Sequence, residues 1–255
     1  MPPAASRARR DEIVRLAERT GLASVLELSR RFGVTASTIR RDLARLHAEG
    51  KLTRTYGGAI ARGSAPEASL RHRIGEDFEV KRRIARWARA QVRAGETVLL
   101  DAGSTVGALA HELRDAEHLT VVTASLTAVQ ALSGAEGVRV EFLGGALRPV
   151  SHSFVGPLAE VALQRRTFDR AFLGTDGIDA DGGICEADQR QTRLKELAAD
   201  RANTVYVLAH AAKLDRRPFH SWARLPPGWT LVTDAAAPRG FVEALRGTGV
   251  DVVLT

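Results

Sequence analysis

Two short segments in the C-terminal part of the chain combine side chains that can bind an anion or move a proton. In LLDAGST, residues 99–105, Asp101 is followed by Gly103, Ser104 and Thr105. Glycine and hydroxyl residues at the start of a helix can hold a phosphate, because the first N–H groups of the helix have no partner within it. A plain turn between a strand and a helix often has the same composition, and that reading stays open.

The second segment, GTDGID at residues 174–179, holds the carboxylates Asp176 and Asp179. Two neighbouring carboxylates can act as acid and base or accept hydrogen bonds from sugar hydroxyls. Ordinary turn chemistry is the alternative, since Asp and Gly are frequent turn residues. Among the lysines, Lys213 can meet a phosphate as a point charge. Lys195, within a predicted helix, is either a ligand contact or a plain surface residue.

These segments follow strands of a predicted α/β domain. Several apolar segments are nearly continuous runs of Val and Leu, which is typical of strands buried on both faces. The predicted strands are 97–103, 119–125, 138–145, 168–175, 203–210, 229–234 and 250–255. The predicted helices are 79–92, 105–114, 125–133, 156–166, 188–202 and 238–247. The alternation predicts a mostly parallel sheet, and ligands of such a sheet collect beyond the carboxyl ends of its strands.

A different pattern marks residues 34–50, VTASTIRRDLARLHAEG. Ile39, Leu43 and Leu46 fall on one side of a helix because they recur at i, i+4 and i+7. The other side is small and polar near its start and then carries arginines. Such a face suits a helix whose N-terminal end enters the major groove of DNA. An ordinary solvated surface helix is the alternative for this stretch by itself.

The flanking segments favour the DNA-binding interpretation. Residues 9–19 and 24–32 are predicted helices, and Gly33 separates the second from the basic helix, as in a helix-turn-helix. Residues 51–59, KLTRTYGGA, can form a wing. Thr35 or Ser37 can cap the basic helix. The candidate DNA-contacting residues are Thr35, Ser37, Thr38, Arg40, Arg41, Arg45, Lys51, Arg54 and Tyr56.

The net charge of the chain is concentrated at its N-terminus. Residues 1–63 hold 13 Lys and Arg against 6 Asp and Glu, whereas the remainder holds 24 of each kind. The surplus of 7 positive charges therefore lies where DNA binding is expected, as neutralisation of phosphates requires. The single cysteine, Cys185, the absence of a long apolar run and a charged N-terminus predict a cytoplasmic protein.

At this point the sequence resembles a known family. Residues 32–59, FGVTASTIRRDLARLHAEGKLTRTYGGA, look like the winged helix-turn-helix of the DeoR family of bacterial transcriptional regulators. LLDAGST, VVTAS, FLGGALR, FVGP and GTDGID follow in the order of the DeoR-type sensor domain, which is similar in fold to ribose-5-phosphate isomerase. The resemblance implies DNA binding, most often repression, and a phosphorylated sugar as effector. In relatives of that fold a loop like Gly103-Ser104-Thr105 binds a phosphate. The candidate effector-binding residues are Asp101, Gly103, Ser104, Thr105, Asp176, Lys195 and Lys213.

The sequence departs from the family pattern at two places. VTAS has Ala124 where the family has asparagine, and residues 210–213 are His-Ala-Ala-Lys where the family has Asp-Ser-Ser-Lys. Both departures remove hydrogen-bonding groups from the expected pocket, so an atypical effector and a lost effector are both open. His210 is either a new ligand contact or a histidine satisfied at a strand end.

We therefore expect a winged helix-turn-helix domain at 1–62 with a disordered start at 1–6, a linker at 63–78, and a Rossmann-like α/β domain for effector sensing and oligomerisation at 79–255. The expected function is that of a homo-oligomeric repressor of carbohydrate genes, which binds double-stranded operator DNA and is released by a phosphorylated sugar. We expect no catalytic residues, cofactor, metal or membrane partner. The alternatives are a sugar-phosphate isomerase or deaminase-like enzyme with a DNA-binding appendage, using the carboxylates and Lys195, and a regulator without effector.

Overall fold

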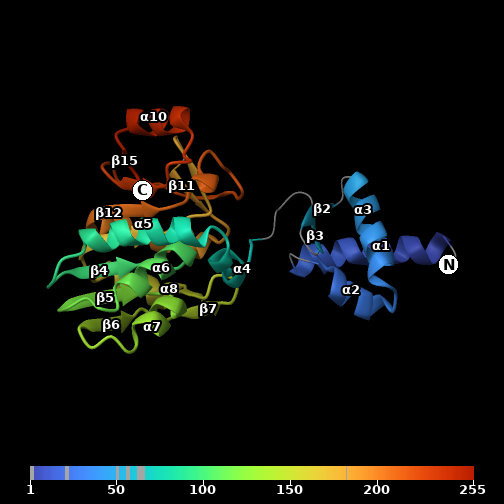
Figure 1. The fold of residues 1–255 in the computed structure, drawn as a ribbon. Coiled ribbons are helices and arrows are strands. Elements are labelled where there is room, and N and C mark those ends of the chain that lie inside the picture. The colour runs from blue at the N-terminus through green and yellow to red at the C-terminus, as the bar shows by residue number, and fades with distance from the viewer. Residues whose placement is uncertain (1–2, 21–22, 50–51, 56–57, 62–66, 182) are drawn as a thin grey trace. The chain divides into compact units, whose positions relative to one another are not determined.

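The computed structural model describes residues 3–20, 23–49, 52–55, 58–61, 67–181 and 183–255, which divide into two compact units, 1–67 and 68–255 (Figure 1). Part of the segment expected as a linker, 63–78, is folded in the second unit. Helix α4, Leu70–Gly75, begins there, because Ser69 caps it and the buried Leu70 donates its N–H to the Val150 carbonyl at 2.9 Å. The exact domain boundaries stay a prediction.

The first unit has the expected helices and wing strands. Its elements are α1 (Pro3–Thr20), β1 (Ala23–Ser24), α2 (Val25–Phe32), α3 (Ala36–Ala48), β2 (Leu52–Thr55) and β3 (Gly58–Ala61). Strand β3 pairs antiparallel with both β2 and β1. The expected disorder is wrong for residues 3–6, which continue α1 toward the N-terminus. Strand β1 is an addition to the prediction, since two residues are too few to show a period.

A small apolar core holds this unit together. Ile13 of α1, Leu28 of α2 and Leu46 of α3 are buried against one another and against Leu52 of β2. Ile39 and Leu43 are also buried, which confirms the inward face predicted for α3 from its i, i+4, i+7 spacing. The outward face of α3 is thereby fixed by packing on its opposite side.

The second unit contains a parallel sheet that comprises, among the described residues, seven strands in the order β15-β14-β12-β9-β4-β5-β6 (Figure 1). Their bounds are β4 (Thr97–Leu100), β5 (Leu119–Thr123), β6 (Val138–Phe142), β9 (Phe168–Leu173), β12 (Ala202–Leu208), β14 (Thr230–Thr233) and β15 (Asp251–Leu254). All the strands predicted as apolar runs are confirmed, with ends that differ from the predicted ones by up to three residues. The α/β fold class is thereby confirmed.

The strand order reverses between β4 and β9. From β4 the chain adds β5 and β6 on one side, and it then returns to add β9, β12, β14 and β15 on the other side. This is the Rossmann order with a further strand at one edge. In such sheets the ligand crevice lies outside the carboxyl ends of the strands at the reversal, where the following loops diverge.

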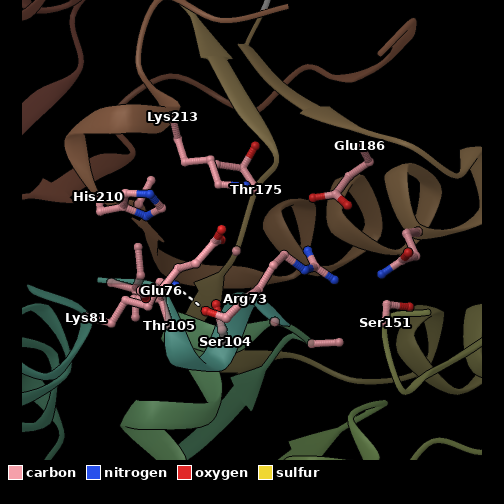
Figure 2. A pocket seen from close by; sticks show the side chains of 16 residues that line it. Arg73, Glu76, Lys81, Ser104, Thr105, Ser151, Thr175, Glu186, His210 and Lys213 are labelled. Atoms are coloured by element: carbon pink, nitrogen blue, oxygen red, sulfur yellow. Dashed lines mark hydrogen bonds between the residues drawn. The ribbon is translucent and has the colours of Figure 1, made fainter. Parts of the chain in front are cut away.

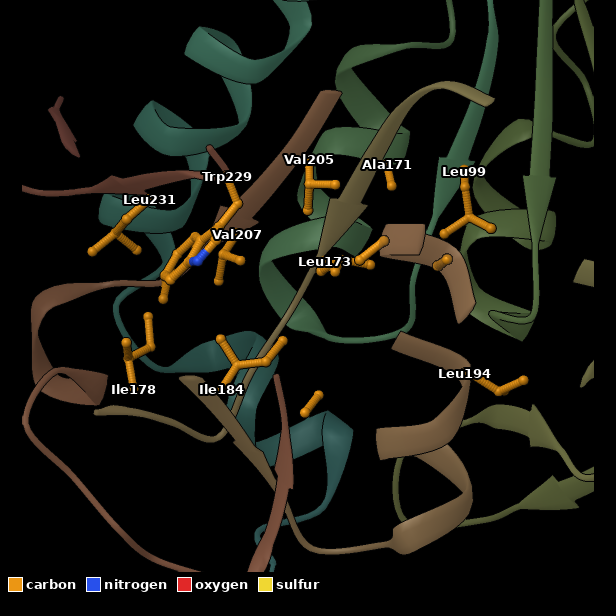
Figure 3. Packing of buried hydrophobic residues seen from close by; sticks show 14 of the residues in the cluster. Leu99, Ala171, Leu173, Ile178, Ile184, Leu194, Val205, Val207, Trp229 and Leu231 are labelled. Atoms are coloured by element: carbon orange, nitrogen blue, oxygen red, sulfur yellow. The ribbon is translucent and has the colours of Figure 1, made fainter. Parts of the chain in front are cut away.

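Helices cover both faces of the sheet (Figure 1). They are α5 (Phe78–Gln91), α6 (Ser104–Glu112), α7 (Leu126–Leu132), α8 (Pro157–Gln164), α9 (Gln189–Asp200) and α10 (Arg239–Gly247), which confirms the predicted helices. Consecutive strand residues pack on opposite faces. Leu99 joins the cluster under α8, α9 and α10 (Figure 3), whereas Val98 and Leu100 join the cluster under α5, α6 and α7.

Short antiparallel strands that were not predicted lie beside this sheet. They are β7 (Ala146–Arg148) with β8 (Ser153–Val155), and β10 (Gly177–Asp179) with β11 (Gly183–Glu186) and β13 (Ser221–Ala223). The turn expected over GTDGID is therefore partly a strand. Gly177 permits the close approach of the chain at Arg216, because a Cβ at position 177 would lie 2.4 Å from the Arg216 carbonyl oxygen.

Candidate functional site

The start of α3 is organised by Thr35. Its hydroxyl accepts a hydrogen bond from the Thr38 N–H at 3.3 Å, so Thr35 and not Ser37 caps the helix. The same hydroxyl lies 2.8 Å from the Ser37 hydroxyl and 3.0 Å from the Thr38 hydroxyl. A cap satisfies one of the N–H groups that the first turn leaves unpaired. Thr35 therefore stabilises the start of α3, and its predicted contact with DNA would be a second role.

The outward face of α3 presents the predicted arginines. Arg40, Arg41 and Arg45 are exposed, as is Ser37, while Thr38 is half-buried. Arg45 pairs with Glu49 one turn later at 3.2 Å. The structure thus brings these side chains together on one surface, and their contacts with DNA stay a prediction.

The wing residues can be placed only in part. Arg54 lies in β2, whose antiparallel partner is β3. Lys51 and Tyr56 lie outside the described residues. The strands of a wing are present, and the roles of its three candidate residues stay predictions.

Sequence reasoning missed a buried ion pair behind α3. Asp42 accepts from Nε of Arg9 on α1 at 2.7 Å, and it lies 3.5 Å from Arg10. The side chains of Arg9 and Asp42 are 7% and 9% exposed. The feature of the sequence that could have revealed this pair is the acidic residue Asp42, which lies within a basic helix directly before Leu43. This pair fixes α3 against α1.

A pocket lies where the strand order of the second unit reverses. The turn after β4 and the turn after β9 both reach it, and the pocket has an empty volume of about 520 Å³ including its open mouth. Figure 2 shows side chains converging on it from several elements. It is lined by Arg73, Glu76, Lys81, Ala102, Gly103, Ser104, Thr105, Ser151, Gly174, Thr175, Glu186, Gln191, Leu208, Ala209, His210 and Lys213.

The turn from β4 into α6 lies at one wall of this pocket, as predicted. Gly103 is the N-cap residue of α6, with a φ of 136° that favours glycine. No side chain caps α6, so its first N–H groups keep their capacity for an anion. Ser104 and Thr105 add hydroxyls beside them (Figure 2). Asp101 points elsewhere, and its carboxylate accepts from the Gly174 N–H at 3.0 Å.

Lys195 is not a surface residue, contrary to one alternative left open by the sequence. Its side chain is 1% exposed, and its ammonium contacts Asp101, Glu186 at 3.0 Å and the Gly174 carbonyl at 2.9 Å. It is absent from the residues that line the pocket. The reason is that α9 packs this face of the helix against β9 and β11. Lys195 therefore braces the pocket wall, and a direct contact with an effector stays a prediction.

One ammonium is shared here between two carboxyl groups. Burial lowers the pKa of Lys195, but the attraction of Asp101 and Glu186 outweighs burial and leaves that pKa above its ordinary value. Burial raises the pKa of Glu186 to about 8, because Lys195 compensates only part of the cost of a buried charge. Lys195, Asp101 and Glu186 thus form one buried cluster, in which the raised pKa of Glu186 favours its neutral form.

Asp176 forms ion pairs with two cationic side chains. Its Oδ1 atom lies 3.1 Å from Arg73 of α4 and 3.3 Å from Lys213, whereas its buried Oδ2 atom has no hydrogen-bond partner among the described residues. Lys213 lines the pocket as predicted. Asp179 does not join them, because it lies in β10 and accepts from Arg217 at 2.6 Å. The two carboxylates of GTDGID therefore have different partners, and a joint role for them stays a prediction.

The pocket also contains residues that sequence reasoning placed in the linker or left open. Arg73 and Glu76 come from the end of α4, and Lys81 of α5 donates to the Glu76 carbonyl at 2.6 Å. His210 lines the pocket and lies 3.4 Å from Asp77. Burial, followed by Lys81 and Lys213, lowers the pKa of His210.

The two family departures have different consequences. Ala124 packs into the apolar cluster under α8 and α9 and is absent from the residues that line the pocket. Whether the missing amide at this position matters to an effector stays a prediction. His210 does line the pocket, and the Ala211 N–H is satisfied by Asp234 at 2.6 Å.

Chemically, the pocket suits a small anion that carries hydroxyl groups. Arg73, Lys81 and Lys213 supply positive charge beside the N-terminus of α6, and Gln191 and Ser151 supply polar atoms that have no partner among the described residues. Within the described residues no group of three or more His, Cys, Asp or Glu side chains could hold a metal ion. No described helix has the length and apolar character needed to cross a membrane.

Comparison with known proteins gives matches over nearly the whole chain. A model of the DeoR-like helix-turn-helix domain matches residues 9–64, and one of the DeoR C-terminal sensor domain matches residues 76–235. The glycerol-3-phosphate regulon repressor of Escherichia coli K12 is 30% identical over 96% of this chain and 98% of its own length. The lactose phosphotransferase system repressor of Streptococcus mutans is 32% identical over 89% and 91%. Ribose 5-phosphate isomerase A of Methanocaldococcus jannaschii aligns with a TM-score of 0.41 and 18% identity over 55% of each chain.

Proposed function

This chain belongs to the DeoR family of bacterial transcriptional regulators, and on that premise we propose that it represses genes of carbohydrate metabolism until a phosphorylated sugar releases it from its operator. It is a DNA-binding regulator, with the winged helix-turn-helix in the first unit and the sensor in the second. The relatives reported above are named as a glycerol-3-phosphate regulon repressor and a lactose phosphotransferase system repressor.

Operator binding is assigned to the outward face of α3. Arg40 and Arg41 are exposed there, and Ser37 and Thr38 near the helix start are small enough for close approach to base edges. Lys51, Arg54 and Tyr56 are assigned to the DNA backbone beside the groove. A homo-oligomer would present two such helices to successive major grooves of a palindromic operator.

Effector binding is assigned to the pocket of the second unit. The phosphate would lie at the N-terminus of α6, where Gly103, Ser104 and Thr105 meet Lys213. The sugar hydroxyls would meet Gln191 and Ser151, whose buried polar atoms have no partner among the described residues. Buried polar groups of that kind gain most from a ligand that pairs with them.

The main support for a regulatory role is the position of Arg73. It lies in α4, which begins within a few residues of the DNA-binding unit along the chain, and it contacts Asp176 at the pocket. An anion in the pocket would compete with Asp176 for the guanidinium of Arg73. Binding would thereby alter the segment that leads to the DNA-binding unit, and a ligand that favours one state over the other shifts the balance between them.

The alternative function is catalysis on a sugar phosphate. The site gives catalysis little support, because the groups that would move protons are engaged in ion pairs. Lys195 contacts two carboxyl groups, and Asp179 contacts Arg217. The relatives are named as regulators. Turnover of ribose 5-phosphate by the purified chain would revive this alternative.

The proposal is tested by fluorescence anisotropy on the DNA upstream of the chain's own gene. Titrations are run at one stated salt concentration, because affinity for DNA depends steeply on salt. We expect preference over random DNA, and relief of binding by one member of a panel of phosphorylated sugars. Binding that no compound relieves would overturn the effector part, and equal affinity for random DNA would overturn the assignment of this operator.

A further inference from the structure

One edge of the sheet in the second unit is open to pairing with another strand. Within the described residues, β6 pairs with β5 on one side and with no strand on the other. The Leu143 N–H that follows β6 donates to the Thr123 carbonyl of β5 at 3.0 Å. Peptide groups alternate in direction along a strand of a parallel sheet. Those of Val138, Val140 and Phe142 therefore point away from β5. The Val138 N–H donates to the Ala135 carbonyl at 3.2 Å, so the groups offered to a partner are mainly those of Val140 and Phe142.

The side chains of this edge complement a second copy of themselves. Arg139 and Glu141 flank Val140 and lie 3.2 Å apart within one copy; the Arg139 side chain is 77% exposed, and Glu141 also contacts Arg166. In an antiparallel pairing of two β6 strands centred on Val140, each Arg139 lies opposite Glu141 of the other copy. A pairing centred on Arg139 or on Glu141 sets like charges opposite each other. Opposed charges on neighbouring strands stabilise a pairing and like charges destabilise it, so the charges select one register.

The same register also buries apolar surface. Phe142, which is 43% exposed, would lie opposite Val138 of the second copy. The Phe142 ring already meets the Phe154 ring edge to face at 4.7 Å, and Leu147, 47% exposed, is the cross-strand neighbour of Phe154. The edge of β6 is thus continuous with apolar surface on the β7–β8 hairpin, which enlarges the area available to a partner.

The opposite edge of the sheet lacks this property. Strand β15, with the sequence Asp-Val-Val-Leu at 251–254, contains one charged residue, so no two-fold pairing of β15 can oppose unlike charges. Charged residues on an edge strand ordinarily deter pairing with other chains. On β6 they deter every partner except one that places an acid opposite Arg139 and a base opposite Glu141, and a second copy of β6 does both.

We propose that β6 is the surface through which two copies of this chain associate, by antiparallel pairing about Val140 that continues the sheet across a two-fold axis. Such an interface is the same patch on both copies, as a closed dimer requires. The N–H and C=O of Val140 in one copy bond the C=O and N–H of Val140 in the other copy, across the two-fold axis. The proposal names the surface of self-association and depends neither on the effector nor on the operator.

The test is the mass of the full-length chain in solution, measured by light scattering without DNA or sugar. R139E places two acidic residues on the edge, and E141R places two basic ones. Each variant alone opposes like charges, whereas a mixture of the two opposes unlike charges at both positions. R239E and E243R serve as matched controls, because Arg239 and Glu243 form an exposed pair on α10 at 3.9 Å.

We expect a dimer, or an even multiple of it, for the wild type, half that mass for R139E alone and for E141R alone, and recovery of the wild-type mass in the mixture. The controls should keep the wild-type mass. V140P gives a second line of evidence, since proline at an edge position removes one outward N–H and leaves the pairing with β5 intact; it should halve the mass. A monomeric wild type, unchanged mass in the single variants and V140P, or a mixture that stays small would overturn the proposal.

Discussion

Arg73 and Asp176 are 103 positions apart in the sequence and 3.1 Å apart in the structure, and this ion pair joins α4 to the loop after β9. Both side chains are nearly buried, so the pair is poorly screened by solvent. It lies at the wall of the pocket assigned to the effector. An anion that bound there and displaced one partner of the pair would therefore change the position of α4.

From this relationship we predict that Arg73→Gln desensitises the protein to its effector. A charge-assisted hydrogen bond contributes about 1.5–3 kcal/mol, which corresponds to roughly a tenfold to hundredfold change in binding. The measurement is the sugar-phosphate concentration that releases half of the bound operator DNA. Arg86→Gln, on the exposed side of α5, is the control. The same half-release concentration in R73Q and wild type would remove Arg73 from the effector site.

Lys195 gives a prediction about stability. Lys195→Met removes the cation from Asp101 and Glu186 in a buried setting, and loss of one partner of a buried pair costs about 3–5 kcal/mol. All three tryptophans, Trp87, Trp222 and Trp229, lie in the second unit, so tryptophan fluorescence during urea unfolding reports on that unit.

The control for that variant is Arg193→Met on the same helix, where the arginine is exposed and pairs with Glu196 at 3.5 Å. Exposed ion pairs contribute little to stability, so its unfolding midpoint should stay close to that of the wild type. Equal midpoints for K195M and R193M would contradict the bracing role of Lys195.

Glu186 adds a dependence on pH. Its pKa is about 8 in the folded chain and near 4.5 when exposed, so unfolding releases a proton between these values. The contribution of Glu186 to stability is therefore complete below pH 4.5 and is lost as pH rises to 8, by at most about 1.4 kcal/mol per pH unit. Glu186→Gln keeps the neutral form at every pH.

The measurement is the free energy of unfolding of the wild type and of E186Q from pH 5 to pH 8, followed by tryptophan fluorescence. We expect the wild type to lose stability relative to E186Q as pH rises. The reason is that Glu186 ionises readily in the unfolded chain but only at the cost of a buried charge in the folded chain, whereas the glutamine of E186Q has no charge in either state. Parallel curves for the two proteins would show that Glu186 is already ionised in the folded state.

The main sheet could be predicted from the sequence because its strands are runs of apolar residues buried on both faces. Such runs differ from helices in length and from loops in hydropathy. Strands β7, β8, β10, β11 and β13 could not be predicted, since each has only three or four residues and its pairing depends on distant partners. Their existence is decided by tertiary contacts.

The candidate pocket could be predicted only where it is built by local turns. Gly103, Ser104 and Lys213 were found because they follow strands. Arg73 was missed, because a basic segment after a Gly- and Pro-containing stretch looks like a solvated linker. The burial of Lys195 could not be predicted for a related reason: the spacing of residues gives the faces of α9 but not which face the sheet covers.

Asp42 and Arg41 are neighbours with opposite environments on α3. Asp42 faces α1 and accepts from Arg9, so Asp42→Ala should destabilise the first unit by about 3 kcal/mol. Hydrogen exchange of peptides within residues 1–67 measures this loss, and tryptophan fluorescence of the second unit is its internal control. Unchanged exchange in D42A would show that the apolar core alone fixes α3.

Arg41 faces solvent, so Arg41→Ala should weaken operator binding without lowering stability. The kind of loss identifies what the side chain contacts. A base contact costs about 1–3 kcal/mol on the operator and little on random DNA, whereas a phosphate contact weakens both and lowers the slope of log affinity against log salt by about 1. Anisotropy titrations at several salt concentrations on both DNAs separate the two cases. Arg86→Ala in the second unit is the matched arginine control. If R41A binds the operator as the wild type does at every salt concentration, Arg41 is not part of the DNA interface, and Arg40 would be the next residue of α3 to test.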